Sequence, residues 1–112
     1  MTLSDLLPLI HGTLLTPDSD PEKELTCGYT CDLLSWVMAH GRPGMAWVTV
    51  QTHLNVIAVA SLSEMACIIL PEGIVMEGAP LEKAGEEGIA VVSSPLSAYA
   101  ICGAMAAKGL PA

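Results

Sequence analysis

The sequence contains no phenylalanine, and its aromatic side chains are limited to two tryptophans and two tyrosines. Positive charge is equally sparse: four basic residues stand against 12 acidic ones, for a formal net charge of −8. The basic residues are scattered along the chain: Lys23, Arg42, Lys83 and Lys108. Nucleic acid or an anionic membrane would require clustered positive charge, so neither is expected as a partner.

Targeting and membrane signals are also missing. The first residues carry no basic stretch, and Asp5 interrupts their apolar run, so they do not read as a signal peptide. The most apolar window, residues 54–70, holds several polar side chains and ends at a Pro-Glu-Gly stop. A helix followed by a strand fits that window better than a transmembrane span. We therefore expect a cytoplasmic protein whose four cysteines are reduced thiols.

Aliphatic side chains are abundant instead. Hydrophobic residues make up 52% of the 112 residues and charged residues only 14%. This length predicts a single domain, residues 1–112, with an aliphatic, methionine-rich core. The apolar excess also leaves surface for a partner, and we expect a homo-oligomer, most simply a dimer.

Short apolar runs alternate with helical segments along the chain. Strands are expected at residues 12–16, 25–29, 46–50, 66–70 and 89–92, and helices at residues 3–7, 32–40, 54–65, 80–87 and 97–108. Expected helix caps are Thr2 or Ser4, then Thr30 or Asp32, and finally Ser94 or Ser97. Continuous apolar strands indicate a sheet covered on both faces, so the sequence predicts a three-layer α/β/α domain with a mostly parallel sheet of about five strands.

Polar residues follow three of the expected strands. In an open parallel sheet, ligands bind beyond the carboxyl ends of the strands, near helix N-termini. The candidate ligand-binding residues, which would suit a phosphate or carboxylate group, are Gln51, Thr52, His53, Asn55, Glu72, Gly73, Ser93 and Ser94. Helix capping explains Thr52, Asn55 and Ser94 equally well. Asp32 and Ser35 either line the same edge or cap their own helix.

Catalytic and metal-binding patterns are weak. Cys27 and Cys31 form one CxxxC pair with no second pair at metal-ligand spacing, so no metal site is expected. The only conceivable nucleophile and base pair is Ser93 or Ser94 with His53, and no acid is placed to orient the imidazole. We therefore expect no enzyme activity and no cofactor.

Three segments carry a resemblance to a known family. They are CDLLSWVMAHG at residues 31–41, WVTVQTHLNVIAVASLSEMACIILPEG at residues 47–73, and GIAVVSSPLSAYAIC at residues 88–102. Together they resemble the DRTGG domain, which is similar to the N-terminal domain of HPr serine kinase/phosphorylase and, in fold, to the N-terminal domain of the Mur ligases. Stand-alone versions look like proteins found beside iron-only hydrogenase genes.

Two departures limit what this resemblance implies. The Asp-Arg-Thr-Gly-Gly signature is absent, since Pro71, Glu72 and Gly73 follow the apolar run, and the phosphate-binding loop of the kinase is absent as well. The resemblance therefore implies a non-catalytic regulatory or ligand-sensing domain for a small anionic, phosphate- or nucleotide-like ligand. The alternative is a protein-interaction or assembly partner in a hydrogenase or redox pathway.

Overall fold

The computed structural model describes all 112 residues and shows five helices and five strands. In chain order these are α1 (Leu3–Leu9), β1 (Thr13–Leu14), β2 (Cys27–Thr30), α2 (Leu34–His40), β3 (Met45–Val48), α3 (Leu54–Leu62), β4 (Cys67–Leu70), α4 (Ala79–Glu86), β5 (Ala90–Ser93) and α5 (Ala98–Ala107). Each predicted element is present, with ends that move by a few residues.

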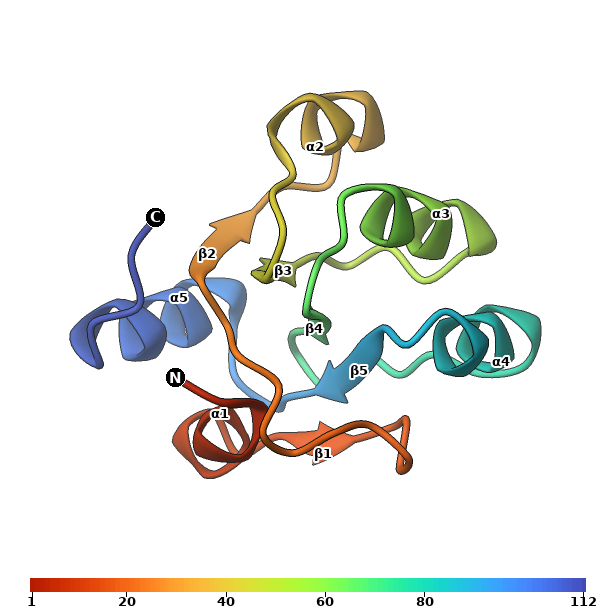
Figure 1. Cartoon of the computed structure of the whole chain (residues 1–112). Helices are drawn as coiled ribbons and strands as arrows, with labels where there is room; N and C mark the ends of the chain where they lie inside the picture. The colour runs from red at the N-terminus through yellow and green to blue at the C-terminus, as the bar shows by residue number, and fades with distance from the viewer.

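The five strands form one sheet in the order β1-β5-β4-β3-β2. β2, β3, β4 and β5 run parallel, while β1 pairs with β5 in the antiparallel direction. Helices α2, α3 and α4 cover one face, and α1 and α5 cover the other (Figure 1). The predicted three-layer α/β/α architecture with a mostly parallel sheet is confirmed. The structure adds the places of the first two strands, one at each edge of the sheet.

The central strands explain why the sequence shows continuous apolar runs instead of alternation. Every residue of β3, β4 and β5 is buried. Trp47, Ile68 and Leu70 pack toward α2, α3 and α4, whereas Val48 and Ile69 pack toward α1 and α5. Because successive side chains of a strand point to opposite faces, a strand buried on both faces must be apolar at every position.

Two expectations about helix ends are wrong. Neither Thr30 nor Asp32 caps α2, which begins after Leu33 without a side-chain cap. The Asp32 carboxylate instead binds groups that follow β3. The first helix does not stop before Pro8 but continues to Leu9, held at its start by a capping box between Thr2 and Asp5. None of the five helices combines the length and the apolar character that crossing a membrane requires.

Candidate functional site

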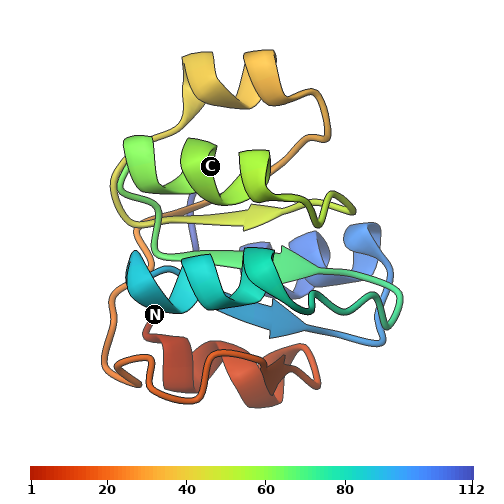
Figure 2. The same ribbon diagram turned by 90° about the vertical axis from the view of Figure 1, so that its right-hand side faces the viewer.

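The carboxyl ends of the four parallel strands lie along one edge of the sheet, on the right in Figure 2. The segments that contain the predicted ligand residues, 51–55, 72–73 and 93–94, all leave the sheet at this edge. Residues 51–55 follow β3, residues 72–73 follow β4, and residues 93–94 end β5. Parallel strand direction therefore brings the three predicted segments to a common side of the molecule.

The loop after β3 is held in place by Asp32, which follows the neighbouring strand β2. One oxygen of the Asp32 carboxylate accepts hydrogen bonds from the Thr49 hydroxyl at 2.7 Å and from the Val50 amide at 3.0 Å. The Gln51 side-chain amide donates to the Asp32 backbone carbonyl at 2.8 Å. Three bonds to one residue fix this loop before any ligand arrives, so Asp32 is a positioning residue at this edge.

His53 lies at the start of α3, and its side chain forms a hydrogen bond with Gln51, two residues earlier in the chain. The Nε2 atom of His53 lies 2.9 Å from Oε1 of Gln51. The Gln51 amide nitrogen already donates to Asp32, so Oε1 faces the ring and the His53 Nε2 carries the hydrogen. His53 is also the N-cap of α3, but no side chain caps that helix, and Thr52 and Asn55 make no side-chain hydrogen bond. Thr52 and Asn55 are therefore not caps, and the first turn of α3 keeps free amides.

The two serines at the end of β5 are occupied by the protein itself. The Ser93 hydroxyl donates to the Ile74 carbonyl, and the Ser94 hydroxyl donates to the Ile10 carbonyl, each at 2.6 Å. Ser94 is fully buried, and its oxygen also accepts from the Leu96 amide at 3.2 Å. Both hydroxyl groups therefore already donate their hydrogen to a backbone carbonyl.

The turn after β4 is bound to the loop after β5. The Glu72 amide donates to the Leu96 carbonyl and the Gly73 amide to the Ser94 carbonyl, both at 2.8 Å. Glu72 and Gly73 have φ values of 60° and 73°, the left-handed conformation that such a tight turn requires. These residues and the serines form one hydrogen-bonded unit, and no hydrogen bond joins that unit to residues 51–55.

Two further residues considered from the sequence have simpler roles. Ser97 is the N-cap of α5, where its hydroxyl oxygen accepts from the Ala100 amide at 3.1 Å. Ser35 is exposed in the first turn of α2 and makes no side-chain hydrogen bond. Capping is therefore the function of Ser97 and not of Ser94.

Sequence reasoning missed an apolar component of this edge. Most of the large hydrophobic side chains that remain exposed lie in or just after the loops at the carboxyl ends of the strands: Leu33, Val50, Leu54, Val75 and Tyr99. Each of them follows a strand by only a few residues, and that position is the signal that could have identified them. Exposed apolar side chains that follow the carboxyl ends of the strands favour a ligand or a partner with an apolar part.

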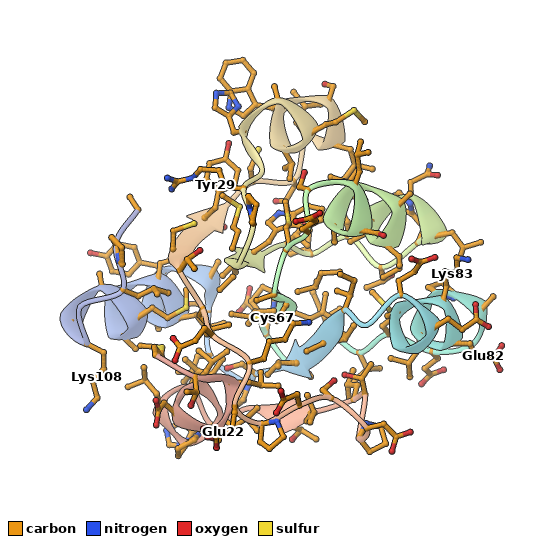
Figure 3. The ribbon with its side chains drawn as sticks, viewed as in Figure 1. Glu22, Tyr29, Cys67, Glu82, Lys83 and Lys108 are labelled. Carbon is orange, nitrogen blue, oxygen red and sulfur yellow. The ribbon has the colours of Figure 1, made fainter.

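The cysteines are not grouped with other side chains that bind metals. All four are free thiols, and no group of three or more histidine, cysteine, aspartate or glutamate side chains could hold an ion. Cys67 is fully buried at the centre of the molecule (Figure 3), and burial raises its pKa to about 12. The Cys31 carbonyl accepts from the Trp47 indole at 2.9 Å.

Three principal hollows lie on the surface, and none of them is lined by the predicted ligand residues. The first, of about 620 Å³, lies between the loop of residues 16–23 and α4. The second, of about 640 Å³, lies between α1 and Lys108, and the third, of about 350 Å³, lies beside β2 and α5. None of these three hollows therefore lies at the predicted ligand residues of the carboxyl edge.

No protein-family model matches the chain, and no curated protein matches it in sequence. Its structure is similar to the crystal structure of the CBS and DRTGG domains of the regulatory region of the Clostridium perfringens pyrophosphatase, complexed with the activator diadenosine tetraphosphate. The TM-score is 0.74 and the sequence identity 11%; the match covers 98% of this chain and 47% of that chain. At this identity the similarity shows the fold, and it supports a DRTGG-like one. The chain spans about half the length of the protein it matches.

Proposed function

We propose that this chain is a non-catalytic regulatory domain that binds a small anionic ligand at the carboxyl edge of its parallel sheet. The observation that carries the proposal is the start of α3, where no side chain caps the helix and the preceding loop is already fixed by Asp32. Free amides at a helix N-terminus attract a phosphate or carboxylate group through direct hydrogen bonds and the helix dipole.

The proposed contacts divide into two groups. Gln51, Thr52, His53 and Asn55 border the start of α3, and they are the side chains proposed to touch the anion. Glu72, Gly73, Ser93 and Ser94 are proposed to shape the neighbouring wall, because their hydrogen-bonding groups are largely engaged with the protein. The exposed Leu54 beside this position suits a ligand that also carries an apolar or aromatic part.

The structural similarity supports the same function. The pyrophosphatase regulatory region was crystallised with a nucleotide activator, and this chain shares its fold over 98% of its length. A nucleotide-like ligand is therefore the first class to test. As a regulatory domain the chain would act through a partner or a second copy, and we propose a cytoplasmic homodimer.

Isothermal titration with ATP, diadenosine tetraphosphate and inorganic phosphate tests the proposal. We expect saturable binding to the wild type and a loss of about tenfold or more in affinity when both Thr52→Ala and His53→Ala are introduced, since each removes a charge-assisted or neutral hydrogen bond. Ser35→Ala is the matched control, because Ser35 is an exposed residue at another helix start with no side-chain bond. Binding that survives the double substitution would contradict this site.

A second candidate function is favoured by the exposed apolar side chains of the same edge. It is a protein-interaction or assembly role in a hydrogenase or redox pathway, without a small ligand. Light scattering separates the quaternary states, because a dimer would show about twice the 11.6 kDa of one chain. Two results together would replace the ligand-sensing role with the interaction role. No anion binds to the chain, and Leu54→Ser disrupts a protein complex that the chain forms in its native organism.

A further inference from the structure

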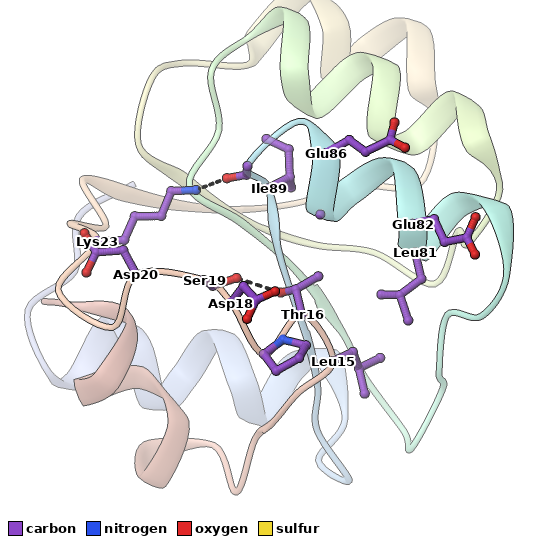
Figure 4. A pocket seen from close by; sticks show the side chains of 13 residues that line it. Leu15, Thr16, Asp18, Ser19, Asp20, Lys23, Leu81, Glu82, Glu86 and Ile89 are labelled. Atoms are coloured by element: carbon purple, nitrogen blue, oxygen red, sulfur yellow. Dashed lines mark hydrogen bonds between the residues drawn. The ribbon is translucent and has the colours of Figure 1, made fainter.

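A groove runs along α4, between this helix and the loop that follows β1, and none of the proposed ligand residues lines it. Its walls are the loop of residues 16–23 and the exposed side of α4, and its volume is about 620 Å³ (Figure 4). The apolar lining consists of Leu15, Leu81 and Ile89, of which Ile89 is buried and the two leucines are half-buried. We call this hollow the α4 groove. A volume of this size is sufficient for several side chains of a bound segment.

The rim of the α4 groove is acidic on both walls. Asp18 and Asp20 belong to the loop, and Glu82 and Glu86 belong to α4; all four residues are exposed. Outside the groove, Lys83 lies 3.8 Å from one oxygen of Glu86 and compensates part of its charge. The other three carboxylates have no ion-pair partner, so the groove carries a net negative charge.

The single basic residue of the lining does not neutralise this rim. Lys23 directs its ammonium group to the Gly88 carbonyl, as the dashed line in Figure 4 shows. Burial lowers the pKa of Lys23, which reflects the loss of water around that ammonium. Lys23 therefore ties the loop to the turn between α4 and β5, and its half-buried ammonium group is already bonded to a backbone carbonyl.

The walls of the α4 groove are held in place by the fold itself. The Thr16 hydroxyl oxygen accepts from the Val91 amide of β5 at 3.0 Å and is 2.8 Å from the Ser19 hydroxyl. At the other end of the loop, Lys23 is bonded to Gly88 in the turn that precedes β5, so both ends of the loop are anchored. On the opposite wall, Gly85 faces open space where any other residue would place a side chain. The groove is thus a preformed feature, which lowers the entropic cost of binding.

We propose that the α4 groove docks a short segment of a different protein in which lysine or arginine alternates with aliphatic residues. The aliphatic side chains would cover Leu15, Leu81 and Ile89, and the basic groups would pair with the carboxylates on both walls. A second copy of this chain is a poor occupant, because its four basic residues are scattered and its net charge is −8. Nucleic acid is repelled by the same charge.

The test uses the full chain and a synthetic peptide, acetyl-Lys-Leu-Lys-Leu-Lys-amide, followed by NMR of the backbone amides. We expect saturable shifts confined to residues 16–23 and 81–89. The double variant Glu82→Gln/Glu86→Gln should weaken binding about fivefold, since two exposed ion pairs are removed. Gly85→Trp should reduce it about tenfold or more by filling the groove. Circular dichroism establishes that each variant is folded.

Matched controls sharpen the result. Gly103→Trp places the same side chain on α5, where a Cβ also meets open space, and should leave binding unchanged. Glu77→Gln removes an exposed carboxylate outside the groove and should have little effect. A peptide with glutamate in place of lysine should not bind. His53 does not line the groove, so His53→Ala should leave peptide binding intact, and failure of the anion site and failure of the groove are separate results.

Three outcomes would overturn the docking proposal. The first is the absence of amide shifts at millimolar peptide, or shifts outside the groove. The second is binding of spermidine as tightly as the peptide, which would assign the groove to a free polyamine. The third is self-association of the chain that Gly85→Trp abolishes, which would make a second copy the occupant.

Discussion

The Asp32 carboxylate accepts a hydrogen bond from the Thr49 hydroxyl, with 2.7 Å between the two oxygens. Thr49 is buried at the end of β3, whereas Asp32 lies at the surface after β2, so the bond joins neighbouring loops across two parallel strands. The same oxygen of Asp32 holds the Val50 amide at 3.0 Å. This contact positions the segment that precedes α3.

Asp32→Ala should lower the free energy of unfolding by about 1–2 kcal/mol, because two hydrogen bonds to a charged acceptor are lost. Urea unfolding monitored by tryptophan fluorescence measures the change. Asp18→Ala is the control, since Asp18 is exposed and makes no hydrogen bond or ion pair, and it should stay within about 0.5 kcal/mol of the wild type. Equal effects of the two substitutions would contradict a positioning role for Asp32.

Ser94→Ala should be more damaging than its small change in volume suggests. The Ser94 hydroxyl is fully buried and serves both the Ile10 carbonyl and the Leu96 amide. Its loss leaves two backbone groups without these partners, at a cost of about 1–3 kcal/mol. Thermal unfolding gives the value, and Ser35→Ala is again the neutral comparison. A stable Ser94→Ala protein with impaired anion binding would instead assign Ser94 to the ligand.

Glycine substitutions should change stability in opposite directions. A Cβ added at Gly85 in α4 or at Gly103 in α5 would meet open space, so Gly85→Ala and Gly103→Ala should each stabilise the chain by up to about 1 kcal/mol. Gly44 has a φ of 77°, and a Cβ there would lie 2.6 Å from atoms of Thr26. Gly44→Ala should therefore destabilise by about 2 kcal/mol. Chemical denaturation of the three variants compares them directly, and a stabilised Gly44→Ala protein would contradict the turn geometry.

The thiol of Cys67 should resist chemical modification in the native protein. Burial raises its pKa from 9.0 to about 12, so at about pH 8 the native chain holds almost no Cys67 thiolate. Iodoacetamide followed by mass spectrometry should label the half-buried Cys31 and Cys102 before Cys67. Labelling of Cys67 at the rate of the unfolded chain would show that this strand is open to solvent.

The raised pKa of Cys67 also predicts how the free energy of unfolding changes with pH. The folded pKa of Cys67 lies above the unfolded value, so the contribution of the neutral thiol to stability is complete below about pH 9. It declines as the pH rises from there toward about 12, because only the unfolded chain can release the proton. The difference in unfolding free energy between the wild type and Cys67→Ala should therefore shrink when measurements at about pH 8 are repeated at about pH 10.

Much of the architecture was predictable from residue patterns. The apolar runs of β3, β4 and β5 lie between helical segments, and such runs are typical of parallel strands buried on both faces. The pairing of β1 was not predictable, because a strand of two residues carries almost no periodic signal. Its antiparallel place beside β5 depends on contacts between Thr13 and Ser93 and between Leu14 and Val92, which are distant in the chain.

The candidate site was predictable in place but not in detail. Strand direction is encoded by the alternation of strands and helices, and it brought residues 51–55, 72–73 and 93–94 to one edge as expected. The partners of individual side chains were not encoded locally. Asp32 reaches Thr49 and Ser94 reaches Ile10, and both bonds cross between elements that are far apart in the sequence.

The sequence by itself determined the layered architecture and its acidic, aliphatic character, because local periodicity and composition dictate which segments can be buried. Only the tertiary structure decided which polar groups remain free. In it the hydroxyls of Ser93 and Ser94 donate hydrogen bonds to backbone carbonyls, and no side chain caps α3. The α4 groove also forms only when α4 and the loop of residues 16–23 come together. The reason is physical. A buried polar group must find a hydrogen-bond partner, and that partner is set by the packing of distant segments.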